Sequence, residues 1–368
     1  MLPPDDPALS LLQVLRDDGS VDEDRDPGLD DATARSIYRH MLRIRLIDER
    51  MLMRQRQGKV GFYGASTGQE ATPVVTAHCL SEADWVFPAL REASIMLVRG
   101  FPLETWLAQI YGNGADVLKG RMQPMHMAGR SVNQVSWSSC LGPQLPQAVG
   151  AAWAMKLQGE QGRVAVAFTG DGATSEPDFH TAMNFAGVYR PPVVLICQNN
   201  HWAISVPSSR QTASATFAVK AHAYGLPGVR VDGNDVLALH AAISEACARA
   251  RRGEGPTFIE AVTYRIGAHS SSDDPSLYRS EEEVAYWRRR DPIVRFERYM
   301  RARGLVTDES RTALERELTE EILRAIRNVE TVPPPDRETL FDDVYAERPW
   351  HLEEQAAELA AHPRAPEH

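Results

Sequence analysis

A carboxylate and an amide each follow a strand-like apolar run in this sequence. Asp171 comes shortly after the run Arg163–Phe168, and Asn200 comes shortly after the run Pro192–Cys197. In an open parallel sheet, ligands bind beyond the carboxyl ends of the strands, so two neighbouring strands can present both side chains to one ion. Mg²⁺ prefers oxygen ligands of this kind and commonly keeps phosphate oxygens in its shell. We therefore expect Asp171 and Asn200 to hold a cation that binds a diphosphate.

Glycines flank Asp171 on both sides. Gly170 and Gly172 would let the backbone approach a diphosphate closely. The helix expected after this loop would add the positive end of its dipole. A lone Gly-Asp-Gly tripeptide is most often an ordinary turn, so the assignment depends on the pairing with Asn200 after the next strand.

Apolar runs alternate with helical patterns through the second half of the chain. The predicted strands and helices, in order, are Arg163–Phe168 (strand), Asp178–Ala186 (helix), Val193–Cys197 (strand), Val229–Val231 (strand), Val236–Arg251 (helix) and Thr257–Ile266 (strand). This alternation predicts an α/β fold, with an open, mostly parallel sheet that carries helices on both faces.

Helices and loops are also expected before the sheet. A long helix should begin after Asp30 or Asp31 and end near Gln57, because its apolar residues fall at helical spacing. Further helices are expected at about 69–79, 102–111 and 144–158, with a glycine-rich loop at Gly61–Gly68 and a long loop at Gly114–Gln134. Long loops inside compact domains are usually functional.

We divide the chain into three parts. Residues 1–29 are rich in Asp and Pro and are expected to form an N-terminal arm. Residues 30–330 are expected to form the α/β domain, which becomes helical and charged beyond Asp291. Residues 331–368 begin with a run of three prolines and are expected to form an acidic C-terminal tail.

Composition excludes several classes of protein. The formal net charge is −10, which argues against a general nucleic-acid-binding surface. No apolar run reaches the roughly 18 residues of a membrane helix. The start of the chain lacks the pattern of a signal peptide and is too acidic for a mitochondrial transit peptide. The 4 cysteines lack metal or redox spacing and should be reduced and mostly buried. We therefore expect a cytoplasmic, bacterial enzyme.

Further motifs follow one another in a characteristic order. They are Phe62-Tyr63, Gly68–Glu70, Arg91–Ala93, Lys119–Arg121, Gln147–Gly150, Asn199–Ser205, Arg230–Asp235, Thr263–Asp274, Tyr278-Arg279 and Phe341–Tyr345. Together with the thiamine diphosphate motif at Asp171 and Asn200, they resemble the α subunit of the E1 component of 2-oxo acid dehydrogenases. The run Thr263–Asp274 most resembles the branched-chain type. The resemblance is collinear and extends from about residue 35 to residue 350.

The resemblance implies a metal site and a cofactor site. Mg²⁺ would be held by Asp171, by the Asn200 side chain and by the backbone carbonyl of Trp202. Thiamine diphosphate would be contacted by Arg91, Ser139, Leu141, Gly170, Gly172, Ala173, Ile204, Arg265 and His269. His269 is also the implied catalytic residue, near the incoming lipoyl group. Phe62 and Tyr63 are candidate walls of the substrate pocket.

The chain departs from the family pattern at several positions. Leu90 stands where the family often has Tyr, and Gln198 stands where it often has Arg, so we assign no diphosphate contact to position 198. Some relatives bind K⁺ through hydroxyl groups of a loop. Ser138 matches that loop, but Pro143 replaces its Thr and offers only a carbonyl. We therefore do not assign a potassium site.

The resemblance implies an oxidoreductase with a disulfide acceptor. It would decarboxylate branched-chain 2-oxo acids, such as 3-methyl-2-oxobutanoate, and reductively acylate the lipoyl group of an E2 acyltransferase. A glutamate that the cofactor needs lies on a separate β subunit in split members of the family. From the length of this chain and its end near Phe341–Tyr345, we expect an α2β2 heterotetramer with the cofactor between α and β.

Several alternatives remain open at this point. A pyruvate or acetoin dehydrogenase α subunit would share every cofactor residue, and a non-enzymatic nucleotide-binding module is a more remote possibility. The segment Gly64–Gly68 matches the G-x-S-x-G pattern of serine hydrolases, but the strong strand that this pattern requires is missing. His126 is either a loop histidine or a site residue. Ser270–Ser272 beside His269 would suit regulatory phosphorylation, which we do not expect in a bacterial chain.

Overall fold

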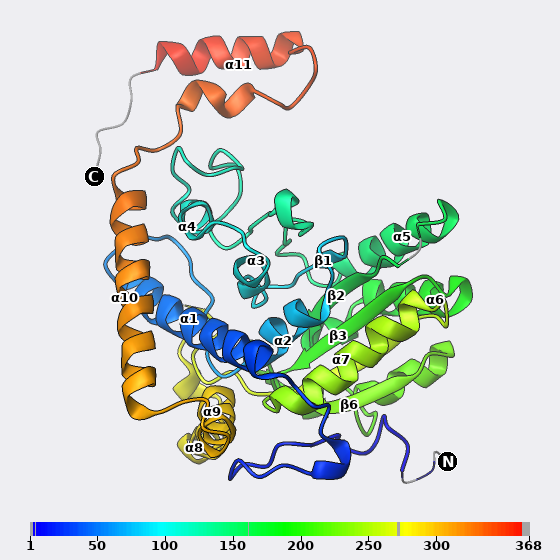
Figure 1. Cartoon of the computed structure of the whole chain (residues 1–368). Coiled ribbons are helices and arrows are strands. Elements are labelled where there is room, and N and C mark those ends of the chain that lie inside the picture. Colours follow the sequence, from blue (N-terminus) through cyan, green and yellow to red (C-terminus); the bar gives the residue numbers. More distant parts are fainter. Residues whose placement is uncertain (1–2, 4, 161, 271–272, 363–368) are drawn as a thin grey trace.

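The core of the protein is a parallel β-sheet. The computed structural model describes residues 3, 5–160, 162–270 and 273–362. Its main sheet has 5 strands in the order β1-β2-β3-β7-β6, and all neighbouring strands are parallel (Figure 1). The strands are β1 (Trp85–Phe87), β2 (Ala165–Gly170), β3 (Val193–Asn199), β6 (Gly228–Asp232) and β7 (Thr257–Val262). The predicted α/β fold is confirmed.

Helices cover both faces of this sheet. On one face, Val166 and Phe168 of β2 join a core with α2 (Ala71–Cys79) and α7 (Val236–Arg251). On the other face, Ala165 and Ala167 of the same strand pack with α5 (Gln144–Leu157) and α6 (Pro177–Tyr189). Because both faces are covered, β2 and β3 are almost continuously apolar, as expected of buried parallel strands.

A second core lies beside the sheet and is formed mainly by helices. Its helices are α1 (Asp31–Arg56), α3 (Ser94–Val98), α4 (Leu103–Tyr111) and α10 (Asp308–Glu330). Asp30 caps the start of α1 by accepting a hydrogen bond from the Thr33 backbone N–H at 2.9 Å. Trp106 of α4 is fully buried in this core, and its indole N–H donates to the Ala93 carbonyl at 3.0 Å. This core therefore anchors the segment that carries Arg91 and Glu92.

Most predicted elements occur where the sequence placed them, and α7 matches residue for residue. The prediction that the last strand reaches Ile266 was wrong, because β7 ends at Val262. Val262 pairs with the final residues of both neighbouring strands, Asn199 and Asp232, and the ladder then ends with one bond from the Thr263 N–H to the Asn199 carbonyl at 2.9 Å. Helix α11 (Trp350–Ala361) in the tail was not predicted, nor were β1 and α3.

The N-terminal segment lies against the edge of the sheet. The backbone N–H groups of Val14 and Leu15 both donate to the Asp235 carboxylate at 2.7 Å. The same carboxylate caps α7 and lies 3.7 Å from the fully buried Arg295 of α9 (Pro292–Ala302). Arg295 also pairs with Asp232 at 2.7 Å. These buried charges therefore tie the arm, the sheet edge and α9 together.

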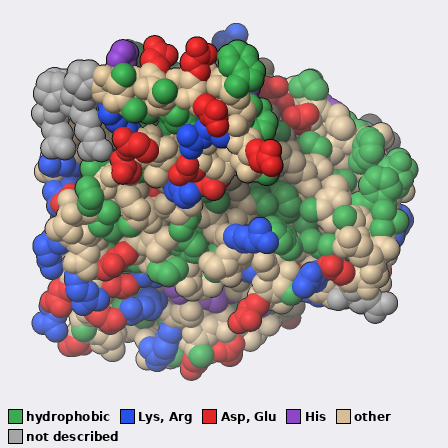
Figure 2. Space-filling view, turned by 90° about the horizontal axis from the view of Figure 1, so that it is seen from above, with side chains coloured by type: hydrophobic (Ala, Val, Ile, Leu, Met, Phe, Trp, Pro, Cys, Tyr) green, Lys and Arg blue, Asp and Glu red, His purple; other side chains and the backbone are tan. Residues whose placement is uncertain are grey.

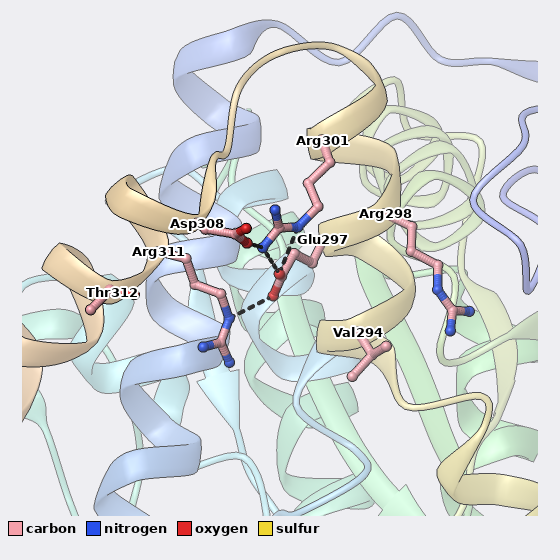
Figure 3. Close-up of a pocket in the computed structure, with 7 residues that line it drawn as sticks. All are labelled: Val294, Glu297, Arg298, Arg301, Asp308, Arg311 and Thr312. Carbon is pink, nitrogen blue, oxygen red and sulfur yellow. Dashed lines mark hydrogen bonds and ion pairs between the residues drawn. The ribbon is translucent and has the colours of Figure 1, made fainter.

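An ion-pair cluster joins α9 to α10 and α1. Figure 3 shows Arg301 and Arg311 pointing toward Glu297, whereas Arg298 points away. The Glu297 carboxylate lies 2.7 Å from Arg301 and 2.9 Å from Arg311, and it accepts a hydrogen bond from the Tyr38 hydroxyl at 2.7 Å. Most charged groups that line the hollow between these side chains pair with one another, so we assign it a structural role.

Replacing Glu297 by Gln should lower the free energy of unfolding by about 1 kcal/mol at pH 7. Burial alone would raise the pKa of Glu297, but hydrogen bonds from Tyr38, Arg301 and Arg311 outweigh it and lower that pKa. The contribution of ionised Glu297 to the free energy of unfolding is therefore present at neutral pH. It is lost as the pH falls through the lowered pKa of Glu297. Urea denaturation at pH 7 and at pH 3 measures this difference. Glu320→Gln, at an exposed position of α10, is the control. Equal losses at both pH values would contradict the ion-pair account.

No helix within the described ranges is both long enough and apolar enough to cross a membrane.

Candidate active site

A cleft of about 610 Å³ opens at the carboxyl ends of β2 and β3. It is lined by every residue that was predicted to hold the metal or the cofactor: Arg91, Ser139, Leu141, Gly170, Asp171, Gly172, Ala173, Asn200, Trp202, Ile204, Arg265 and His269. These residues come from separate segments that only the fold brings together. The structure brings these residues together in one cleft, and the roles predicted for them are proposals.

The register of the sheet brings Asp171 and Asn200 together. Gly170, the last residue of β2, pairs with Gln198 of β3, so the loops after both strands begin at the same level. The backbone N–H of Asn200 contributes a hydrogen bond to the Asp171 carboxyl, and Gln211 donates to it at 2.9 Å. Burial nevertheless raises the pKa of Asp171 to about 6. A bound cation would favour the ionised carboxylate in this place.

Hydrogen bonds fix the orientation of the Asn200 side chain. Its amide group donates to the Gln69 side chain at 3.1 Å, and its Oδ1 accepts from the Trp202 backbone N–H at 3.1 Å. The preceding Asn199 is held separately, because its amide donates to the buried Glu260 at 2.8 Å. Asn200 Oδ1 therefore has a defined position and keeps a lone pair for a ligand.

Two arginines in the cleft lack a neutralising carboxylate. Arg91 donates to the carbonyls of Ala65 and His269, and Arg265 donates to the carbonyls of Trp202 and Ile204. In the described part of the chain, neither guanidinium forms an ion pair. Burial, with help from Arg265, lowers the pKa of Arg91 to about 10, so it stays a cation at neutral pH. Two buried cations side by side are an arrangement that an anionic ligand would stabilise.

His269 lies between these arginines, on the segment that follows β7. Its backbone N–H donates to Asp273 at 2.6 Å, and the Asp273 carboxylate also accepts from the Tyr278 hydroxyl at 2.6 Å. Nδ1 of His269 is 3.5 Å from Arg265 Nη1. Burial, with Arg91 and Arg265, lowers the pKa of His269 to about 4. The imidazole is therefore neutral near pH 7.

The rim of the cleft is apolar and partly strained. Ile204 has a φ of 55°, in the left-handed region that β-branched residues rarely adopt. It lies in the short hairpin formed by β4 (Trp202–Ala203) and β5 (Val206–Pro207), and Arg265 holds its carbonyl at 2.7 Å. Leu141 and Ile204 are 57% and 54% exposed. Backbone strain that the surroundings maintain is typical of functional sites, so these side chains are suited to contact a ligand.

Tyr63 does not line this cleft, unlike Phe62. Its side chain is fully buried, and its hydroxyl donates to Asp48 at 2.7 Å. The buried Asp48 also accepts hydrogen bonds from the backbone and side chain of Ser66. Tyr63 and Ser66 thus hold the Gly61–Gly68 loop against α1. Ser66 has none of the exposure that a hydrolase nucleophile needs.

The cleft fits a diphosphate and its metal. A Cβ atom on Gly170 would meet no protein atom within 4 Å, so open space lies over the backbone there. A Cβ atom on Gly172 would come within 2.6 Å of Ala203, so only glycine allows this close approach. Five cleft side chains have a buried polar atom with no partner in the described structure, namely Gln69, Glu92, Gln198, Gln211 and Arg265. Such atoms suit a polar ligand.

The structure also locates the remaining candidates. His126 contacts the Ser139 hydroxyl through Nε2 and stacks near Trp137, so it supports the loop at the cleft. Cys140 is exposed there, in contrast to the buried Cys197 and Cys247. Ser271 and Ser272 lie outside the described residues. Gln69 and Gln211 were not assigned roles from the sequence; Gln69 stood in a matching motif, whereas Gln211 carried no such signal.

Comparisons with known proteins give a consistent result. Residues 38–338 match the family model described as "Dehydrogenase E1 component". The chain is 41% identical over 360 residues to the mitochondrial 2-oxoisovalerate dehydrogenase subunit alpha of Caenorhabditis elegans, covering 97% of this chain and 83% of the relative. For the human subunit, identity is 40% over 356 residues, covering 96% and 80%. For subunit alpha 2 of Arabidopsis thaliana, identity is 39% over 345 residues, covering 93% and 73%. This chain belongs to the dehydrogenase E1 component family.

Proposed function

We propose that this chain is the α subunit of an E1 component that decarboxylates branched-chain 2-oxo acids, such as 3-methyl-2-oxobutanoate. The observation that carries the proposal is the cleft in which unpaired Arg91 and Arg265 lie beside Asp171 and Asn200. The relatives are named 2-oxoisovalerate dehydrogenase subunits, which favours this substrate over pyruvate or acetoin. Membership of an enzyme family argues against a non-enzymatic nucleotide-binding module.

Thiamine diphosphate and Mg²⁺ are the groups that we assign to the cleft. The metal would be held by the Asp171 carboxylate, Asn200 Oδ1 and the Trp202 carbonyl, all of which are oxygen donors. When bound, thiamine diphosphate supplies the electron sink that decarboxylation of a 2-oxo acid requires. The protein supplies the rest: Arg91 and Arg265 offset the phosphate charge, and Gly170 and Gly172 allow close approach.

His269 is the residue that we assign to the reacting groups. Its neutral imidazole can accept or donate one hydrogen bond at the mouth of the cleft. Arg91 and Asp273 hold its backbone on either side, so the ring is positioned without its nitrogen atoms being consumed by strong bonds. We expect it to orient the substrate and the incoming lipoyl group, which are the other partners of this site.

The surface of the chain is suited to partner subunits. Leu141 and Ile204 expose apolar side chains at the rim of the cleft, and helix α11 in the tail has no buried residue within the described structure. The tail side also exposes Leu340, Val344, Tyr345 and Trp350. Figure 2 looks onto the molecule from this side and shows hydrophobic patches among charged side chains. We assign these surfaces to a β subunit in an α2β2 assembly, with an E2 lipoyl domain reaching the cleft.

Co-expression with a β-type partner tests this proposal. The αβ complex should reduce a dye with 3-methyl-2-oxobutanoate at least about tenfold more efficiently than with pyruvate, a ratio within what pocket shape can provide. The isolated α chain, as the control, should have little activity, because part of the site lies on the partner. A preference for pyruvate would exclude the branched-chain assignment, and full activity of the α chain alone would exclude the shared site.

The location of the enzyme in a bacterial cytoplasm remains a prediction. The relatives named above are mitochondrial proteins, and their location does not transfer to this chain.

A further inference from the structure

Glu92 is a buried carboxyl group in the cleft to which the proposed cofactor contacts assign no role. Its side chain is only 2% exposed, and it lines the same cleft as Asp171 and Arg265. Its Oε1 accepts a hydrogen bond from the side-chain amide of Gln198. Its Oε2 has no hydrogen-bond partner among the described residues. An unsatisfied buried oxygen of this kind normally destabilises a protein, so this one needs an explanation.

Gln198, which donates this hydrogen bond, also has a side-chain oxygen that is unpaired among the described residues. Its amide nitrogen donates to Glu92, but its Oε1 is also buried without a partner in the described structure. The two unsatisfied atoms therefore belong to two groups that already share one hydrogen bond. Both are acceptors while Glu92 is ionised, and they would repel each other. A proton on Glu92 Oε2 would convert this repulsion into a second hydrogen bond, to Gln198 Oε1, and would close a cyclic acid–amide pair.

The pair lies at the diphosphate end of the cleft. Gln198 of β3 pairs in register with Gly170 of β2, directly before Asp171. Glu92 follows Arg91, one of the two unpaired cations. A negative charge on Glu92 would therefore oppose the binding of a diphosphate, whereas a neutral acid–amide pair would not.

The surrounding charges favour the neutral form. Glu92 forms no ion pair with any described residue, since Arg91 is directed to the carbonyls of Ala65 and His269. Burial raises the pKa of Glu92 to about 7, against the lowering effects of the Gln198 hydrogen bond, of the nearby backbone of Ala89 and Arg91, and of the Arg91 charge. The other titratable or charged groups that line the cleft are Cys140, Asp171, Glu176, Arg265 and His269. A bound diphosphate would raise this pKa further.

We propose that Glu92 and Gln198 form a neutral carboxylic acid–amide pair when thiamine diphosphate is bound. The inference rests on the proposed function, because it requires the diphosphate to occupy this cleft. Glu92 is then a positioning residue: it takes up one proton as the cofactor binds and keeps the floor of the cleft uncharged. Cofactor affinity should consequently fall as the pH rises above neutrality, because ionised Glu92 must regain its proton on binding.

Glu92→Gln provides a sharp test, because an amide can close the same pair without a proton. Binding of Mg²⁺ and thiamine diphosphate to the αβ complex can be followed by fluorescence of Trp137 and Trp202, which line the cleft. From pH 7 to pH 9, the Kd of the unmodified complex should rise about 50-fold, whereas that of Glu92→Gln should stay nearly constant. At pH 9 the variant should bind the cofactor more tightly than the unmodified complex. Glu176→Gln, the same change at a half-exposed carboxyl of this cleft, should retain the original pH dependence.

A second measurement needs no variant. Calorimetric titration of the unmodified complex at pH 8, in buffers of different ionisation heat, should show net uptake of close to one proton per cofactor. No uptake, or the same pH dependence in Glu92→Gln as in the unmodified complex, would overturn the acid–amide pair and leave the proposed function standing. Failure of the unmodified complex to bind the cofactor would instead overturn the proposed function, and the inference with it.

Discussion

Replacing Asp171 by Asn should weaken the binding of Mg²⁺ and thiamine diphosphate by about 10³-fold, with a matching loss of decarboxylase activity. The carboxylate is the only charged oxygen among the three metal ligands that we assign to the cleft. Removing one charged member of a buried cluster typically costs about 3–5 kcal/mol, which corresponds to that factor. Asn keeps the size of the side chain and one oxygen, so the change isolates the charge.

The same substitution should stabilise the cofactor-free protein. Burial raises the pKa of Asp171 to about 6, so above that pH the folded chain holds a carboxylate that water would solvate better. Removing that charge should raise the free energy of unfolding by about 1–3 kcal/mol at pH 8. Opposite signs for stability and affinity are typical of a residue retained for function.

Isothermal titration of the αβ complex measures the affinity, and urea denaturation of the cofactor-free complex measures the stability. Asp178→Asn, in the first turn of α6, is the matched control and should leave the affinity unchanged. Near-normal cofactor binding by Asp171→Asn would contradict the metal site, even if activity were lost.

The location of the site could be predicted from the sequence because its signals are local. Asp171 and Asn200 each follow an apolar run within three residues, and parallel strands place such residues at one edge of the sheet. The positions of these two strands could be predicted from the apolar residue types in each run alone. The same reasoning placed α7, whose N-cap Asp235 precedes an apolar period.

The supporting contacts could not be predicted in this way because they join distant segments through single side chains. Gln211 reaches Asp171 from a loop whose residues show no periodicity. Tyr63 donates a hydrogen bond to Asp48 and therefore does not reach the cleft. From residue type alone, Phe62 and Tyr63 look equally suited to line a pocket. The early end of β7 also depends on its neighbours, since β3 and β6 both end level with Val262 and leave only the Thr263 N–H bonded to Asn199 beyond it. Burial and pairing are properties of the fold, so they become visible only once it is known.

The cleft combines groups that are each unfavourable without a ligand. Arg91 and Arg265 lie close together without a carboxylate, Asp171 is buried, and Ile204 is strained. A diphosphate would neutralise the two arginines, and the metal cation bound to it would neutralise the Asp171 carboxylate. The fold therefore positions the charged groups of the cleft before the cofactor binds.

Replacing His269 by Asn should lower the kcat for reductive acylation of a lipoyl group by about 100-fold, while cofactor affinity changes little. A positioned histidine typically contributes about 10²–10⁴-fold through hydrogen bonding or proton transfer. Asn leaves the backbone contacts of residue 269 with Arg91 and Asp273 in place, because these use the carbonyl and the N–H group. The loss should therefore report on the imidazole alone.

The pH dependence of this loss distinguishes a neutral imidazole from an imidazolium. Burial and two neighbouring arginines lower the pKa of His269 to about 4, so its protonation state should not change between pH 6 and pH 8. The ratio of the kcat of the unmodified complex to that of His269→Asn should then be constant over this range. If the imidazole instead titrated near pH 7, the ratio would fall about tenfold for each pH unit below that value. His222→Asn, at a partly exposed histidine, is the control and should show normal rates throughout. A constant ratio would mean that burial, the largest cause of the lowered pKa, keeps the imidazole uncharged even when a diphosphate offsets the charge of the two arginines.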